Sequence, residues 1–217
     1  MKFLLTSAGL SNKTIKKAFF DLVGKAPEKI KVAFIPTASN IEAGDKWWVI
    51  KDLKTLQDMN IGQIDIVDIS ALPAKILHKR FSKADIIFCE GGNTFYLMKW
   101  IKKSKLSDFL PKLLETKVWI GVSAGSIVVG KKLSSFDNIF DENGKAYSNN
   151  LGLGYLNFCI KPHYLNPNFA SAKKIRKMAE SLETNIYAID DQSAIVVNGG
   201  KIDVISEGQW NEFGENK

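Results

Sequence analysis

One serine lies between small residues in the stretch GVSAGSIVV, residues 121–129. Gly121 and Gly125 flank Ser123 in the pattern G-x-S-x-G, and an apolar run precedes them. In this pattern a strand turns sharply into a helix, and the serine hydroxyl is presented at the edge of a sheet. The start of the helix also places backbone N–H groups beside the hydroxyl, where they could stabilise an oxyanion. A tight glycine turn without catalytic function has the same letters, so the rest of the chain must separate the two interpretations.

A serine hydroxyl needs a nearby base to act as a nucleophile, and histidine is the usual one. The chain contains two histidines, His78 and His163. His78 lies in the helical, lysine-rich stretch KILHKR, which is typical of a solvated surface. His163 lies in IKPHYLNP, at the exit of a predicted strand. We therefore expect His163 to be the base for Ser123, with a buried or capping histidine as the alternative.

Short apolar strands alternate with amphipathic helices along the chain. We expect strands within residues 2–8, 31–39, 64–70, 84–92, 117–122 and 155–164, and helices within 11–26, 46–60, 74–83, 93–104, 106–116, 124–133 and 168–183. Residues 185–206 read as one more strand followed by a hairpin that turns at Asn198-Gly199-Gly200. This order predicts a single α/β domain over residues 1–217, with a mainly parallel sheet and helices on both of its faces.

Ligands of such sheets bind at the carboxyl ends of the strands. Three predicted strands end in unusual sequences: FCEGGNTF, GVSAGS and IKPHY. We therefore expect these three segments to meet in one site.

Composition excludes several classes of function. The formal net charge is +7, but the lysines are scattered and lack the arginine clusters of a nucleic-acid site, so a diffuse basic surface is the expectation. No apolar stretch is long enough for a signal peptide or a membrane helix, and Cys89 and Cys159 read as buried free thiols, so we expect a cytoplasmic protein. Two distant histidines and two separated cysteines do not form a zinc set, and no cofactor motif is present, so we expect neither a metal nor a cofactor.

Five ordered motifs together carry a family resemblance. They are VAFIPTAS, GGNTFYL, GVSAGS, LGLGYLNFCIKPHY and IDDQSAIVV, which begin at residues 32, 91, 121, 151 and 189. The chain resembles the peptidase E group, the aspartyl dipeptidases of peptidase family S51, and more distantly their cyanophycinase relatives. The resemblance covers nearly the whole chain. It implies a fold like that of class I glutamine amidotransferases, with serine in place of their cysteine.

Carried over by position, the resemblance implies that Ser123 is the nucleophile and His163 the general base. The oxyanion hole would use the backbone N–H of Ala124 and one from the Gly91-Gly92 turn. Asn93 and Thr94 would line the pocket.

The third catalytic residue stays open between two aspartates. Peptidase E-like enzymes imply an acid shortly after the serine, which maps to Asp137 and which we prefer narrowly. Cyanophycinase-like relatives imply an acid after the histidine, which maps to Asp191. Because aspartate is one methylene shorter than the glutamate of those relatives, its reach to His163 is in question.

The implied activity is hydrolysis of short peptides with an N-terminal aspartate, through an acyl-enzyme. An aspartyl side chain needs a cation in the pocket, and the candidate is Arg176, with Lys173 and Lys174 as rivals. The alternatives are a cyanophycinase-like or other acidic-peptide hydrolase, an esterase of the α/β-hydrolase type, and a non-catalytic anion-binding α/β domain. The partner we expect is a small peptide, without nucleic acid or membrane. A homodimer remains open.

Overall fold

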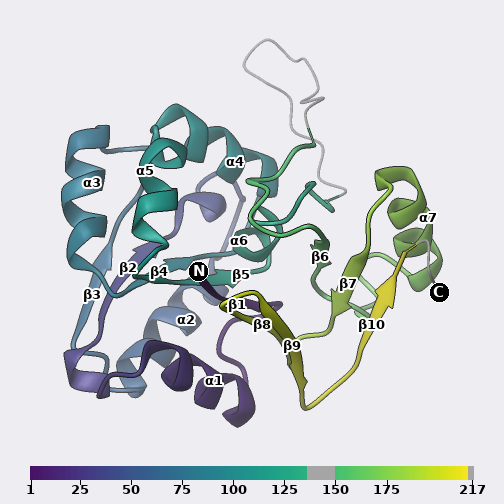
Figure 1. The fold of residues 1–217 in the computed structure, drawn as a ribbon, viewed down its shortest axis with the longest axis horizontal. Coiled ribbons are helices and arrows are strands. Elements are labelled where there is room, and N and C mark those ends of the chain that lie inside the picture. Colours follow the sequence, from purple (N-terminus) through teal and green to yellow (C-terminus); the bar gives the residue numbers. More distant parts are fainter. Residues whose placement is uncertain (136–149, 215–217) are drawn as a thin grey trace.

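The computed structural model describes residues 1–135 and 150–214 of the chain. Its centre is a seven-stranded sheet in the order β3-β2-β4-β5-β1-β8-β9 (Figure 1). These strands are β1 (Lys2–Thr6), β2 (Lys31–Ile35), β3 (Gln63–Ile66), β4 (Ile86–Cys89), β5 (Val118–Val122), β8 (Ser193–Asn198) and β9 (Lys201–Ser206). The first five strands in this order are parallel, and β8 and β9 continue the sheet as an antiparallel hairpin. The hairpin turns at Gly199 and Gly200, both with positive φ, as the sequence predicts.

Helices cover both faces of this sheet (Figure 1). One face carries α1 (Lys13–Val23) and α2 (Trp47–Asp58); the other carries α3 (Ala74–Lys83), α4 (Thr94–Lys103) and α5 (Leu106–Leu113). Strand β1 illustrates why both faces need a covering layer: successive side chains of a strand point to opposite faces, and those of β1 are apolar on both. Phe3 and Leu5 belong to the apolar cluster of the α3–α5 face, and Leu4 belongs to that of the α1–α2 face. The predicted mainly parallel sheet with helices on both faces is thus confirmed.

A second, three-stranded sheet lies beside the first and was not predicted. It contains β6 (Cys159–Lys161), β7 (Ile186–Ile189) and β10 (Trp210–Phe213), in the order β10-β7-β6. Helix α7 (Ala172–Leu182) packs on it through Ile175, Ala179 and Leu182 (Figure 1). The loops that follow β6 and β7 therefore start from the second sheet and not from the central one.

Three short helical elements complete the described chain. Two are 3₁₀ turns, Pro27–Lys29 and Thr37–Ser39, and the third is α6 (Ala124–Ile127), which directly follows β5. Helix α6 is shorter than the 124–133 that the sequence predicts. Among the described helices, none has both the length and the apolar character to cross a membrane.

Candidate active site

Ser123 lies at the turn between β5 and α6, with φ 45° and ψ −104°. Positive φ is uncommon for residues other than glycine, and such strain gathers at functional positions. The turn is fixed to the end of β1: the Ser123 N–H donates to the Thr6 carbonyl at 3.0 Å, and the Ser126 hydroxyl donates to the same oxygen at 2.8 Å. The Ser123 backbone and the first turn of α6 are therefore both fixed to the end of β1.

The two glycines around Ser123 are required by space. A Cβ on Gly121 would lie 2.6 Å from the Gly125 carbonyl oxygen, and one on Gly125 would lie 2.0 Å from the Cys89 carbonyl oxygen. Helix α6 is thus nearly in contact with the end of β5, as the G-x-S-x-G pattern predicts, and also with the end of β4.

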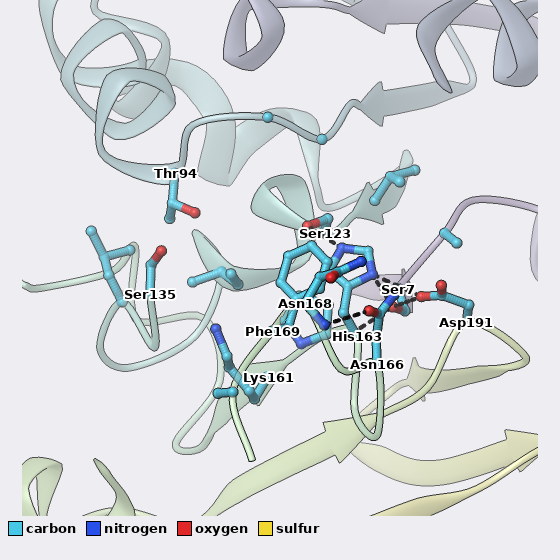
Figure 2. Close-up of a pocket in the computed structure, with 18 of the residues that line it drawn as sticks. Ser7, Thr94, Ser123, Ser135, Lys161, His163, Asn166, Asn168, Phe169 and Asp191 are labelled. Carbon is cyan, nitrogen blue, oxygen red and sulfur yellow. Dashed lines mark hydrogen bonds and ion pairs between the residues drawn. The ribbon is translucent and has the colours of Figure 1, made fainter. Parts of the chain in front are cut away.

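His163 and Asp191 form a line of hydrogen bonds with Ser123 (Figure 2). The His163 Nε2 lies 3.1 Å from the Ser123 Oγ, and its Nδ1 lies 2.8 Å from the Asp191 Oδ1. His163 follows β6 and Asp191 follows β7, so the small sheet supplies two of the three groups. The shorter aspartate does reach the imidazole.

The protonation of this line follows from its partners. A carboxylate can only accept a hydrogen bond, so the Nδ1 of His163 carries the proton and its Nε2 presents a lone pair to the Ser123 hydroxyl. The hydrogen bond with His163 is the main cause that lowers the pKa of Asp191, and a hydrogen bond from Ser7 adds to it, while partial burial opposes both. The geometry suits proton transfer from Ser123 to His163.

Two contacts hold the His163 ring and backbone in place. The ring of Phe169 stacks on the imidazole with centroids 4.2 Å apart. The backbone of His163 has φ 60°, and its N–H donates to the Ser7 Oγ at 2.8 Å. A non-glycine residue in this conformation needs such support from its surroundings.

The Gly91-Gly92 turn lies against Ser123, but its two N–H groups differ. The Gly91 N–H donates to the Glu90 Oε1 at 2.8 Å, and a Cβ on Gly91 would lie 3.3 Å from the Ser123 Cβ. The Gly92 N–H and the Ala124 N–H, in contrast, donate to no acceptor within residues 1–135 and 150–214. Of the oxyanion candidates, Gly92 and Ala124 thus offer free donors, whereas the Gly91 N–H is occupied.

A pocket of about 1230 Å³ opens above Ser123. Thr94 lines it and is buried, whereas the expected Asn93 does not line it, because its side chain caps α4 by accepting from the Tyr96 N–H.

Of the cations that the sequence offers for the pocket, only Lys174 lines it. Arg176 and Lys173 are exposed on α7 and do not line the pocket; Lys174 does, together with Lys161 and Lys177. Residues 174 and 177 share a helix face that residue 176 does not, because successive helix positions are turned by about 100°. Lys161 is 6% exposed, and Figure 2 shows its side chain rising from β6 into the pocket.

A second pair of acidic groups borders the same pocket. Asp52 of α2 and Glu90 at the end of β4 are 4% and 0% exposed, and each carboxyl group affects the pKa of the other. Burial raises the pKa of Asp52 to about 7. Burial, followed by the charge of Asp52, raises the pKa of Glu90 well above its usual value. The described residues contain no acidic, histidine or cysteine cluster that could hold a metal ion.

Sequence reasoning placed some of these residues and missed others. Ser123, His163 and Asp191 come together, whereas Asp137 lies outside the described residues. Ser7, Lys161 and Phe169 were missed. The available signal for Lys161 was a lysine in the apolar stretch before His163.

Comparison with known proteins identifies the family. The sequence model of peptidase family S51 matches residues 3–205. The chain belongs to this family. It is 27% identical to an uncharacterized peptidase of Listeria monocytogenes over 174 residues, which cover 79% of this chain and 83% of that protein. It is 28% identical to peptidase E of Pasteurella multocida over 198 residues, which cover 85% of this chain and 79% of that protein.

Solved structures agree with this assignment. A crystal structure of a Listeria monocytogenes EGD-e protein described as a candidate peptidase E matches with a TM-score of 0.79 at 25% identity, over 95% of this chain and 98% of that one. A peptidase from an acI-B1 Actinobacterium shares the fold with a TM-score of 0.66 at 15% identity, over 100% of this chain and 95% of that one. This S51 member is therefore a peptidase of α/β fold.

Proposed function

We propose that this S51 peptidase is a serine-type dipeptidase that cleaves short peptides after an N-terminal aspartate. The observation that carries the proposal is the hydrogen-bonded line from the Ser123 Oγ through His163 to Asp191, with distances of 3.1 and 2.8 Å. A hydroxyl, an imidazole and a carboxylate in this order are the parts of a serine hydrolase triad.

The reaction then has two halves. The Ser123 Oγ attacks the scissile carbonyl carbon while its proton passes to the Nε2 of His163, and the imidazolium gives that proton to the leaving amine. Water, deprotonated by the same nitrogen, hydrolyses the acyl-enzyme and releases the N-terminal residue. Asp191 holds the imidazole in the required tautomer and stabilises its charge.

The oxyanion of each tetrahedral intermediate would be bound by the N–H groups of Gly92 and Ala124. Ala124 directly follows Ser123, Gly92 lines the same pocket as Ser123, and neither N–H has an acceptor within the described chain. The occupied Gly91 N–H supports the turn instead. One such donor is commonly worth about 10²–10³ in rate.

The preference for aspartate rests on the resemblance to peptidase E and on the cations of the pocket. We assign Lys161 to the substrate carboxylate in place of Arg176, because Lys161 lies in the pocket two residues before His163 and Arg176 does not line it. Lys174 and Lys177 add positive charge at the same wall. A cation inside a partly desolvated pocket attracts a carboxylate more strongly than one in bulk water.

The test of the chemistry is a panel of dipeptides with Asp, Glu, Asn or Ala as first residue, assayed with native protein and with Ser123→Ala. We expect turnover of Asp-Xaa, and a loss in kcat of roughly 10⁶ in the variant, with an unchanged melting temperature. Unchanged activity of Ser123→Ala would remove Ser123 from the mechanism.

The test of the specificity compares Lys161→Met with Arg176→Met. Loss of a charge-assisted hydrogen bond predicts that Lys161→Met lowers kcat/KM for Asp-Xaa about 10- to 100-fold. Its kcat/KM for Ala-Xaa should change much less, and Arg176→Met should retain the native preference. The opposite ranking of the two variants would restore Arg176 as the reader of the substrate.

A further inference from the structure

Ser7 is a buried hydroxyl at the junction between the two halves of the site. It directly follows β1, whose last residue, Thr6, accepts the hydrogen bond from the Ser123 N–H. Ser7 is 1% exposed, and its Oγ lies within 3.2 Å of the Nδ1 of His163.

The hydrogen bonds of this hydroxyl have only one consistent direction. The backbone N–H of His163 can only donate, so the Ser7 Oγ accepts it at 2.8 Å. The Asp191 carboxylate can only accept, so the single Ser7 proton goes to its Oδ1 at 2.6 Å. The hydroxyl therefore bridges the histidine backbone and the carboxylate, as Figure 2 shows.

This bridge acts on both groups that serve Ser123. His163 has a positive φ of 60°, and the bond from its N–H fixes that conformation and hence the direction in which the imidazole leaves the backbone. The Asp191 Oδ1 receives both the Ser7 O–H and the Nδ1–H of His163, so it is aimed at the ring by two donors.

We propose that Ser7 is a positioning residue that fixes the imidazole of His163 and the carboxylate of Asp191 in the direction required to activate Ser123. This inference rests on the proposed serine mechanism and extends it to a fourth side chain. Its hydroxyl transfers no proton in the reaction.

The test measures the rate at which a serine-directed phosphonate ester labels Ser123, because this rate reports the reactivity of the nucleophile without a peptide substrate. In Ser7→Ala, loss of a hydrogen bond to a charged group predicts labelling about 10- to 100-fold slower, with KM for dipeptides nearly unchanged and kcat reduced by a similar factor. Ser11→Ala is the matched control: the Ser11 hydroxyl donates to the Asp191 backbone carbonyl at 2.7 Å and does not contact the carboxylate. It should label within about twofold of the native rate.

Two further comparisons separate positioning from a structural role. Ser7→Thr and Ser7→Val have similar shapes and differ in the hydroxyl, so Thr should label faster than Val even where Ser7→Ala folds poorly. In the Asp191→Asn background, Ser7→Ala should slow labelling several-fold less than it does in the native background, because coupled residues are not additive.

The outcomes distinguish the two proposals. Native protein that neither labels nor hydrolyses peptides would overturn the serine mechanism and this inference with it. Three results, each obtained with native protein that does label, would overturn the role of Ser7 alone. These are an equal labelling rate in Ser7→Ala and native protein, equal rates in Ser7→Thr and Ser7→Val, or fully multiplicative losses of rate in the double variant.

Discussion

The two halves of the active site are held in place by different forces. On the side of the central sheet, Ser123 is fixed by backbone sterics, since α6 lies so close to β5 at Gly121 and to β4 at Gly125 that neither glycine admits a Cβ. On the side of the small sheet, His163 and Asp191 lie in loops and are fixed by hydrogen bonds, with Phe169 stacked on the imidazole.

The comparison separates two kinds of failure. Close-packed backbone cannot make room for an added side chain, so a change at the glycines should lower the free energy of unfolding more than it lowers the rate of the reaction. A hydrogen-bonded loop can lose one partner and remain folded, so changes around His163 should act mainly on rate. Apart from the loss of the Ser123 nucleophile itself, changes in the hydrogen-bonded half should therefore appear mainly in activity assays, and changes at the glycines of the steric half mainly in unfolding assays.

In the hydrogen-bonded half, Asp191→Asn should have a large effect on rate, second to loss of His163 itself. An amide in place of the carboxylate no longer enforces the proton on the Nδ1 of His163, and comparable triads lose about 10⁴ in kcat. The assay compares kcat for Asp-Xaa in Asp191→Asn and in Asp137→Asn, with melting temperatures as a check of folding. A greater loss in Asp137→Asn would transfer the role of orienting acid to Asp137.

In the steric half, Gly125→Ala should lower the free energy of unfolding by about 3 kcal/mol or more, because the new Cβ meets backbone and neither strand nor helix can move aside. Gly154→Ala is the control: Gly154 has φ 71° and no atom within 4 Å of a built Cβ. Gly154→Ala should lower the free energy of unfolding by only about 1–2 kcal/mol, because alanine is less stable than glycine in the left-handed backbone conformation. Denaturant unfolding measures both, and equal losses would contradict the steric account.

The Asp52–Glu90 pair behind the Gly91 turn should have a smaller effect, which is a dependence of the free energy of unfolding on pH. Because the pKa of Asp52 is raised from 3.8 to about 7, the folded chain keeps a proton that the unfolded chain releases above pH 4. The free energy of unfolding should therefore fall as pH rises from about 4 to about 7, by at most about 1.4 kcal/mol per pH unit for one group.

Asp52→Asn should flatten this slope, as measured by denaturant unfolding at several pH values. Asp191, whose pKa is lowered, acts with the opposite sign and at lower pH, since its contribution is lost as pH falls below the ordinary value of 3.8. An identical slope in native protein and variant between pH 4 and 7 would contradict the assigned burial of the pair.

The steric half could be predicted from the sequence because its sequence pattern is local. Gly121, Ser123 and Gly125 stand within five residues, and the strand before them is wholly apolar, so the turn can be recognised without knowledge of the rest of the fold. The helix cap at Asn12 and the hairpin at Gly199 and Gly200 are recognisable for the same reason.

The hydrogen-bonded half depends on contacts between distant segments. Ser7 and Asp191 are 184 residues apart in sequence, and their bond exists only because the loops after β1 and β7 meet. No local pattern marks Ser7 as different from any other serine at a strand end. Periodicity likewise does not tell which strands leave the main sheet, so the three-stranded sheet and the position of Lys161 in the pocket were not foreseen.

The central claim is that the Ser123 hydroxyl is a nucleophile activated by His163. Its most direct test is to incubate native protein and His163→Ala with a serine-directed phosphonate ester and to locate the adduct by peptide mass spectrometry. We expect one adduct, on the peptide that contains Ser123, formed quickly in native protein and far more slowly in the variant. An adduct on another serine, or equal rates in the two proteins, would contradict the claim.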